Sequence, residues 1–291
     1  MKKSIALLAL STTLLVTGCQ QGRDTFEDHF KEYSFKFEVA HEDEDAIYNG
    51  IYKNAAYLSS YERIEQAYSR NGFVESSGVE KTIIDIKEDS SEPDCLIVEN
   101  TETSEESRAE YGVSYKDYNG SKVTAFHKGS YLYETIETYA NDKSTKSKIS
   151  SVVSESSKAY KESYLKSLIN FSTSGAAGGS GHYFVCSDDS YAYVASYIIK
   201  NVSTVQWGDK TRDRIILRKE QIAFFISKDF KLTSSYSYSE TKTNYDSTTG
   251  EWFGSEKLFN RLYLSVKYKY EKRESASINS LTRAYDDFQT K

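Results

Sequence analysis

Apolar and polar positions alternate in several segments of this chain. The run from Ser34 to Val39, SFKFEV, alternates strictly, and KTIIDIKE, KVTAFHKG and SYLYETIETYA do so further on. A period of two gives a strand one apolar face, so each run predicts a β-strand. Asn119-Gly120 lies between two of the runs and predicts a hairpin, because both central residues of the favoured tight turn take positive φ. Together these segments predict an antiparallel meander.

Two other segments have the three-to-four-residue period of an amphipathic helix. The first is residues 45–70, which Asn71-Gly72 would end; its main stripe is Ile47, Ile51, Ala55 and Leu58, and Tyr57, Tyr61, Ile64 and Tyr68 continue beside it. The second is residues 145–171, with the stripe Ile149, Val152, Val153, Ser156, Tyr160, Tyr164 and Leu168. We therefore expect two long helices.

A glycine-rich stretch, STSGAAGGSG at residues 172–181, follows the second predicted helix. Glycine makes regular structure costly, so we expect a flexible loop here. The loop would be either a lid over a pocket mouth or a plain connection. It lacks the G-K-[ST] ending of a phosphate-binding loop.

Long alternating segments return after this loop. Residues 190–199 and 214–227 predict strands, and Lys228-Asp229 predicts a turn between the second of these strands and the next. The last predicted pair of strands is unusually long, which favours a strongly curved sheet. It carries four alternating tyrosines that would either line a groove for an apolar ligand or cover helix surfaces: Tyr236, Tyr238, Tyr268 and Tyr270.

The beginning of the chain has the features of a secretory signal. Lys2 and Lys3 precede an apolar run over residues 5–16, which is too short to span a bilayer. The four residues Val16-Thr17-Gly18-Cys19 resemble the bacterial lipobox. An ordinary secretory signal that ends before a cysteine by chance is the alternative.

The lipobox resemblance implies three things about the mature protein. Residues 1–18 would be a signal peptide, Cys19 would become the N-terminus with a diacylglyceryl group on its thiol, and residues 19–28 would be a lipidated tether. Two or more acyl chains hold a protein on a bilayer far longer than one does. We therefore expect an extracytoplasmic protein that is anchored to the cell membrane by lipid, with residues 29–291 forming a single α+β domain.

The amino-acid composition argues against one class of partner for this domain, nucleic acids. The chain has 37 basic and 43 acidic residues and a net charge of −6, with signs interspersed. Such a chain lacks the basic patch expected of a nucleic-acid-binding protein. Once Cys19 is lipidated, Cys95 and Cys186 remain; outside the cytoplasm they would form a disulfide, or each would be a small buried apolar residue.

The side chains that could act in catalysis or bind a metal do not have the spacing of a known catalytic or metal-binding motif. His29, His41, His127 and His182 lack zinc-ligand spacing, and there is no G-x-S-x-G elbow. The acidic run HEDEDA, at residues 41–46, lacks the spacing of an EF-hand and suits the N-terminal turn of a helix. We therefore expect a non-enzymatic protein with no catalytic residues, no metal site and no cofactor.

The order of predicted elements, with the segment FISKDFKLTSSYSYSE and a strand–turn–strand passage that spans Ile222 to Tyr238, resembles the half-barrel lipoproteins of the LolA and LppX groups. The resemblance implies an α+β fold in which a curved antiparallel sheet, a half-barrel, packs around two long helices and leaves an apolar cavity. It implies a cell-envelope lipoprotein that binds a lipid or another hydrophobic small molecule. The alternative is a surface-exposed lipoprotein that contacts an envelope protein or a glycan and has no ligand cavity.

Overall fold

The computed structural model describes residues 35–72, 74–141, 143–171, 181–246, 249–252 and 258–290. The predicted signal peptide (1–18), Cys19, the tether (19–28) and all of the glycine-rich loop except Gly181 lie outside these ranges. No helix in the described part of the chain is both long enough and apolar enough to cross a membrane.

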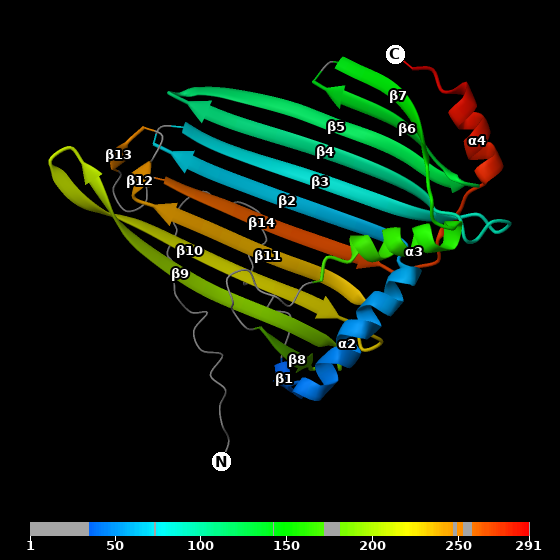
Figure 1. Ribbon diagram of the computed structural model, residues 1–291, viewed down its shortest axis with the longest axis horizontal. Helices are drawn as coiled ribbons and strands as arrows, with labels where there is room; N and C mark the ends of the chain where they lie inside the picture. The colour runs from blue at the N-terminus through cyan, green and yellow to red at the C-terminus, as the bar shows by residue number, and fades with distance from the viewer. Residues whose placement is uncertain are drawn as a thin grey trace.

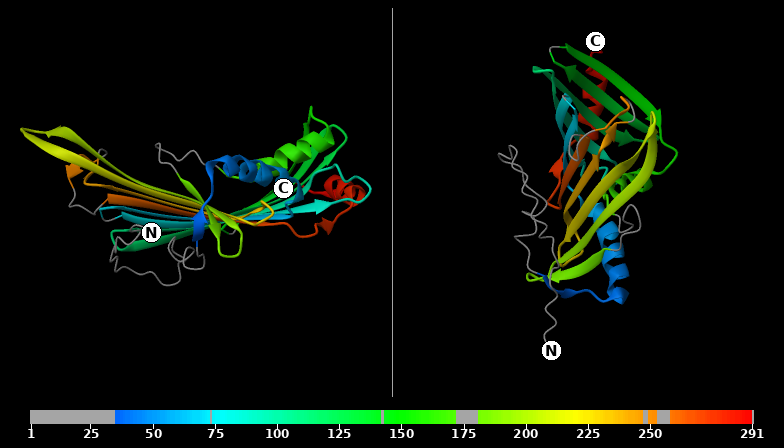
Figure 2. Two further views of the ribbon diagram at one scale, coloured as in Figure 1. Left: turned by 90° about the horizontal axis from the view of Figure 1, so that it is seen from below. Right: turned by 90° about the vertical axis from the view of Figure 1, so that its left-hand side faces the viewer.

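Thirteen strands join in one open sheet in the order β1-β8-β9-β10-β11-β14-β2-β3-β4-β5-β6-β7, with β15 paired to β3. The sheet is antiparallel apart from the short β15–β3 contact, and it twists strongly (Figures 1 and 2). A separate pair, β12–β13, lies outside the sheet. The strands are β1 (Phe35–Glu38), β2 (Ser60–Asn71), β3 (Val74–Glu88), β4 (Ile97–Glu110), β5 (Val113–Lys128), β6 (Tyr131–Ala140), β7 (Lys143–Val152), β8 (His182–Cys186), β9 (Tyr191–Trp207), β10 (Lys210–Ile226), β11 (Leu232–Thr243), β12 (Tyr245–Asp246), β13 (Glu251–Trp252), β14 (Leu258–Lys269) and β15 (Glu274–Ser275).

The described helices are short and lie at one end of the sheet (Figure 1). They are α2 (His41–Asn54), the 3-10 turn η1 (Ala55–Tyr57), α3 (Ser157–Leu168) and α4 (Ile278–Asp287). We call this the covered end. The opposite end, where the hairpins β2–β3, β4–β5 and β9–β10 turn, is the open end.

Helices cover both faces of the sheet at the covered end. Helices α2 and α3 pack on one face, here the helix face, through a cluster that includes Ile51, Leu165, Val98 and Ala125. Ile97 and Phe126 alternate with Val98 and Ala125 along the same strands, so they point to the other, outer face. There they pack against Ile278, Leu281 and Tyr285 of α4. A third cluster lies elsewhere on the outer face, around Cys186, Phe225 and Tyr236.

This architecture contradicts the predicted fold class. The protein is mostly sheet, and the sheet does not pack around two long helices. Helices α2 and α3 cover only the covered end (Figure 2). The side chains of the large apolar cluster pack between these helices and the sheet. The predicted half-barrel around two helices is therefore wrong.

The first predicted helix, residues 45–70, is a helix only in its first part. Helix α2 and η1 end at Tyr57, and β2 takes the chain from Ser60 to Asn71. Tyr61, Ile64 and Tyr68 fit a helical stripe, but β2 hydrogen-bonds to β14 on one side and β3 on the other. Pairing on both edges outweighs a weak local helical pattern.

The second predicted helix, residues 145–171, also divides into a strand and a helix. Strand β7 pairs with β6 as far as Val152, and α3 begins only at Ser157. The side chain of Ser156 accepts a hydrogen bond from the backbone N–H of Ala159, which is the arrangement of a helix N-cap. The predicted apolar stripe therefore runs across two separate elements.

The predicted hairpin at Asn119-Gly120 is wrong. The strand predicted at residues 34–39 is confirmed in the described part of the chain as β1, Phe35–Glu38, and the turn at Lys228-Asp229 is confirmed. Strand β5 runs straight through Asn119-Gly120. The chain turns instead at Tyr111-Gly112, where both residues have positive φ. A Cβ on Gly120 would overlap the ring of Tyr139 on β6. Glycine is used there to let an aromatic ring lie over the strand, not to form a turn.

Candidate functional site

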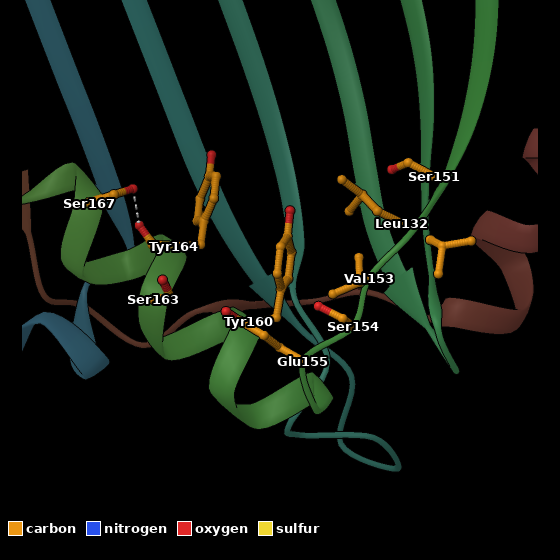
Figure 3. A pocket seen from close by; sticks show the side chains of 10 residues that line it. Leu132, Ser151, Val153, Ser154, Glu155, Tyr160, Ser163, Tyr164 and Ser167 are labelled. Atoms are coloured by element: carbon orange, nitrogen blue, oxygen red, sulfur yellow. Dashed lines mark hydrogen bonds between the residues drawn. The ribbon is translucent and has the colours of Figure 1, made fainter.

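A pocket of about 420 Å³ lies between α3 and the adjoining ends of β6 and β7 (Figure 3). It is open to solvent on one side. Its lining mixes hydroxyl groups, aromatic rings, aliphatic side chains and one carboxylate. The lining residues are Leu132, Ser151, Val152, Val153, Ser154, Glu155, Tyr160, Ser163, Tyr164 and Ser167.

One face of α3 supplies four of these residues, because Tyr160, Ser163, Tyr164 and Ser167 follow the i, i+3, i+4, i+7 spacing of a single helix face. Both rings project from the helix toward the strands (Figure 3). The Ser167 hydroxyl donates to the Tyr164 carbonyl oxygen at 2.7 Å, which holds it against the helix backbone.

Both tyrosines keep their protons at neutral pH. Burial raises the pKa of Tyr164 to about 12, helped by Tyr160 and by the carboxylate of Glu134. Burial also raises the pKa of Tyr160, with further contributions from Glu134 and Glu155. Each neutral phenol can donate one hydrogen bond and accept others.

A buried histidine lies beneath the pocket. His127 of β5 faces Leu132 of β6 in the register, and Leu132 faces Ser151 of β7. His127 is fully buried and stacks on Tyr160, with ring centroids 5.5 Å apart. Neither ring nitrogen has a hydrogen-bond partner among the described residues. Burial lowers the pKa of His127, so its imidazole is neutral.

Sequence reasoning missed this arrangement. His127 has no metal-ligand spacing to mark it, and Tyr160 looks like part of one continuous helical stripe. The only signal in the sequence is the Tyr-x-x-Ser-Tyr-x-x-Ser spacing of residues 160–167, which places two aromatic and two hydroxyl side chains on one helix face. The pairing of strands in the sheet brings this helix face next to His127, and no local sequence pattern shows that pairing.

The four predicted ligand-facing tyrosines do not share a face. Tyr236 faces Ser265 in the β11–β14 register and belongs to the outer-face cluster, and Tyr238 packs against that cluster. Tyr268 and Tyr270 belong to or pack against the helix-face cluster. The single groove predicted for them is therefore not formed. Burial raises the pKa of both Tyr268 and Tyr270 above its ordinary value.

The two cysteines are far apart in the fold. Cys95 lies in the α4 cluster and Cys186 in the other outer-face cluster, and both are buried free thiols. Burial is the main cause that raises both thiol pKa values, so neither is a reactive thiolate at neutral pH. The predicted disulfide is not formed, and the structure has the other alternative, two small buried side chains.

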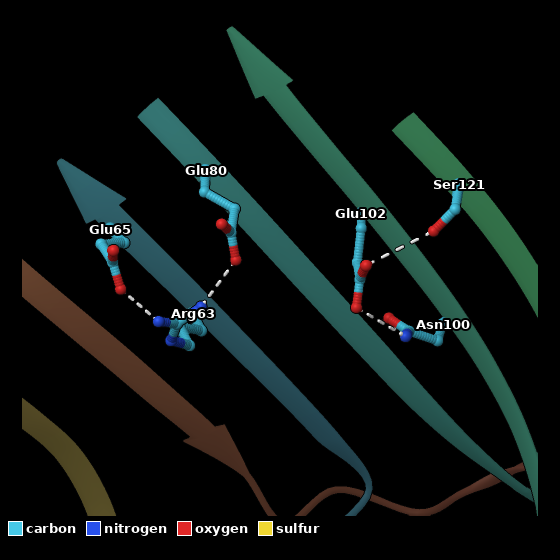
Figure 4. Close-up of polar contacts among 6 residues, drawn as sticks. All are labelled: Arg63, Glu65, Glu80, Asn100, Glu102 and Ser121. Carbon is cyan, nitrogen blue, oxygen red and sulfur yellow. Dashed lines mark hydrogen bonds and ion pairs between the residues drawn. The ribbon is translucent and has the colours of Figure 1, made fainter. Parts of the chain in front are cut away.

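Beyond α2 and α3, the helix face carries charged and polar side chains that contact one another (Figure 4). Arg63 forms ion pairs with Glu65 and, at 2.8 Å, with Glu80. Glu102 accepts hydrogen bonds from Asn100 at 3.1 Å and Ser121 at 3.4 Å. These carboxylates already have partners within the sheet. In the residues that the structure describes, no three His, Cys, Asp or Glu side chains are grouped so that they could hold a metal ion.

Comparisons with known proteins add little to this geometry. No protein-family model matches the chain, and no curated protein is similar to it. Among solved structures, a β-barrel-like protein of a domain of unknown function (DUF1849) from Brucella abortus is 8% identical, with a TM-score of 0.26; the match covers 74% of this chain and 99% of that one. A TM-score this low supports no conclusion about the fold or the function of this chain.

Proposed function

We propose that this chain is a lipid-anchored protein of the bacterial cell envelope that binds a carbohydrate, without catalysis, in the pocket beside α3. The location is supported by the sequence Val16-Thr17-Gly18-Cys19. The ligand class is supported by one observation: Tyr160, Tyr164 and a set of serine hydroxyls line the same open pocket.

A sugar ring matches this lining because it has apolar C–H faces and a rim of hydroxyls. The C–H faces would lie on the tyrosine rings, which combine apolar faces with a polar tip. The serine hydroxyls can both donate and accept, and the Glu155 carboxylate can only accept, so together they can pair with several sugar hydroxyls. An open pocket also admits one end of a longer glycan chain.

A purely hydrophobic ligand fits less well. Such a ligand would cover the hydroxyls of Ser151, Ser154 and Ser163 without pairing them, which costs free energy. The large apolar space that a lipid carrier needs would lie between the sheet and α2 and α3, where the helix-face cluster is packed instead. The competing hypothesis is that the pocket binds a lipid through Leu132, Val152 and Val153. The experiment must distinguish lipid binding from glycan binding.

Binding assays test the ligand class directly. The chain from Gln20 to Lys291 would be titrated with a panel of bacterial envelope glycans and, separately, with fluorescent lipids. We expect glycan binding that Tyr160→Ala weakens about fivefold, because one aromatic contact contributes about 1 kcal/mol. Tyr160→Phe should retain most of the affinity, and Tyr57→Ala, at an exposed tyrosine outside the pocket, should change nothing. Lipid binding in the absence of glycan binding would contradict the proposal.

Fatty-acid labelling tests the location. Cells that make the native chain or Cys19→Ala would be grown with a labelled fatty acid, and the chain would be isolated from the membrane fraction. We expect label on the native chain only. An unlabelled native chain would remove the anchor from the proposal and leave the glycan assay unaffected.

A further inference from the structure

The β9–β10 hairpin extends beyond its neighbours in the sheet. Strand β8 pairs with β9 only as far as Val194, and β11 pairs with β10 only from Ile216 onward. Residues 202–215 therefore form a two-stranded ribbon, which projects from the open end of the molecule in Figure 1. We call residues 198–218, the two-stranded part and its base, the β9–β10 ribbon.

Large apolar side chains are exposed on the outer face of this ribbon. Ile198 is 66% exposed and Val202 is 55% exposed. Val202 faces Ile215 across the ribbon, and Lys200 faces Leu217, so all of these lie on one face together with a lysine. Trp207, at the turn, is 40% exposed; it alternates onto the helix face, where its ring centroid lies 6.3 Å from that of Tyr245. Exposed aliphatic side chains gathered in this way mark an interaction surface.

The ribbon is also basic in an acidic chain. It has five cationic and two anionic side chains, a net charge of +3, whereas the whole chain has −6. The anions are Asp209 and Asp213, and the cations are Lys200, Lys210, Arg212, Arg214 and Arg218. Lys200 shares the outer face with the aliphatic side chains, whereas the other four cations alternate onto the helix face, so the ribbon has an apolar face and a basic face. Among the described residues, Lys200 and Lys210 form no ion pair, so their charges are available to a partner. Arg212 lies over the ring of Trp252, 5.7 Å from its centroid.

Charge complementarity and the apolar residues together favour one partner, a bilayer surface with anionic headgroups. Lysine and arginine near such a surface each add to binding, and tryptophan prefers the depth of the headgroups. The ribbon cannot enter the hydrocarbon, because the backbone groups along its free edges would lose their hydrogen bonds. It would lie at the interface, with its aliphatic side chains just below the headgroups.

We infer that the β9–β10 ribbon is a second membrane contact of this protein, one that binds anionic lipid headgroups. This contact goes beyond the proposed function and does not depend on the lipid at Cys19. In an anchored chain it would hold the open end of the sheet near the membrane, and it would set the orientation of the pocket at the other end.

Vesicle binding tests the inference on the chain from Gln20 to Lys291, which cannot carry the Cys19 lipid. The sheet pairings and the three apolar clusters come from residues 35–290, so this chain retains them. We expect it to sediment with vesicles of phosphatidylglycerol mixed with phosphatidylcholine, and not with phosphatidylcholine alone. High salt should release it, since the attraction is screened.

Two variants that lose the same number of positive charges test whether the ribbon is the surface that binds the vesicles. Removing three cations by Lys200→Gln, Lys210→Gln and Arg212→Gln should weaken vesicle binding about 100-fold, at about fivefold for each charge. The control changes Lys53, Lys158 and Lys166, three exposed lysines of α2 and α3, to Gln. It alters the net charge equally and should leave binding within about twofold of the unchanged chain. Equal losses in the two triple variants would overturn the inference.

The two tryptophans of the chain provide an independent measurement. Trp252→Phe leaves Trp207 as the sole tryptophan. Brominated lipid in the anionic vesicles should quench the emission of Trp207, because it would lie at the headgroup level. Vesicle binding without quenching would overturn the assignment to the ribbon. Self-association of the chain without vesicle binding would mean that the ribbon contacts a second copy instead, and would also overturn it.

Discussion

The two ends of the sheet are built differently although the same strands run through both. At the covered end, Ile97 and Val98 are neighbours on β4, and each is buried beneath a helix on its own side of the sheet. At the open end, Val113 on β5 and Val202 on β9 are both more than half exposed. The comparison teaches that apolar burial, and with it stability, is concentrated at the covered end, while main-chain pairing and contacts between exposed side chains extend the open end into solvent.

The largest expected effect is at the covered end. Leu58 follows η1, is fully buried and belongs to the helix-face cluster. Leu58→Ala should lower the free energy of unfolding by about 2–5 kcal/mol, because it removes apolar contacts and leaves a cavity. Urea unfolding followed by circular dichroism would measure it. A loss below about 1 kcal/mol would mean that the helices contribute little to stability and would break the comparison.

A loss of stability of intermediate size tests whether side chains are also tightly packed on the sheet away from the helices. Gly120→Ala on β5 should cost about 1–3 kcal/mol, because the new methyl overlaps the ring of Tyr139. Adding Tyr139→Ala to the same chain should restore part of the loss. Gly78→Ala on β3 is the matched control, since its Cβ would meet only the Glu105 carbonyl oxygen at an ordinary 3.6 Å. Both unfolding midpoints come from the same urea titration.

A smaller effect depends on pH. Burial lowers the pKa of His127, so the unfolded chain binds a proton more readily than the folded one. Protonation of His127 therefore favours the unfolded chain: this cost is absent above the ordinary histidine pKa of about 6.5, and it grows as the pH falls from there through the lowered pKa of the folded state. His127→Phe should make the urea midpoint less sensitive to pH between neutral and mildly acidic solution, and should raise stability by about 1 kcal/mol at neutral pH.

The control for His127 is His41, whose side chain is 95% exposed and whose ring pairs with Glu44 at 3.0 Å. His41→Asn should leave the pH dependence of unfolding close to that of the unchanged chain. If His127→Phe and His41→Asn change the pH dependence of unfolding equally, the buried histidine does not account for the acid sensitivity. The loss of stability in acid would then not be specific to the covered end.

The smallest effect is expected at the open end. Val202→Ser should change the free energy of unfolding by no more than about 0.5 kcal/mol, because the side chain is already 55% exposed. The same urea titration gives the value. A loss comparable to that of Leu58→Ala would show that the ribbon is part of the cooperative core, and the distinction between the two ends would then fail.

The sequence predicts the parts of this fold that local patterns decide. Strand β1 and the Lys228-Asp229 turn follow from alternation and from turn residues, and the structure has both. Strand β2 could not be predicted, because Tyr61 and Ile64 fit a helical stripe as well as a strand and the choice depends on pairing with β14, some 200 residues later. Asn119-Gly120 has the sequence of a tight turn, and no neighbouring residue in the sequence shows that the ring of Tyr139 packs over Gly120.

The candidate site was harder to predict than the fold. The helical spacing of Tyr160 and Tyr164 is visible in the sequence, but the pocket also needs Leu132 and Ser151 from two strands. His127 contributes through stacking, which requires β5, β6 and α3 to meet. The export signal and Cys19 depend only on consecutive residues, so they were predicted from sequence alone and await the labelling experiment.

The strand order has a consequence for how the chain reaches this fold. Strand β14 lies between β11 and β2, so it joins the meander β2–β7 to the group β8–β11. During synthesis or export it emerges after both groups, and until it arrives each of them ends in an unpaired edge. We expect assembly to be slow and to finish with the insertion of β14, since contacts between distant parts of a chain form late. A chain that lost residues 258–269 would be left as two separate sheets with exposed edges, prone to aggregation.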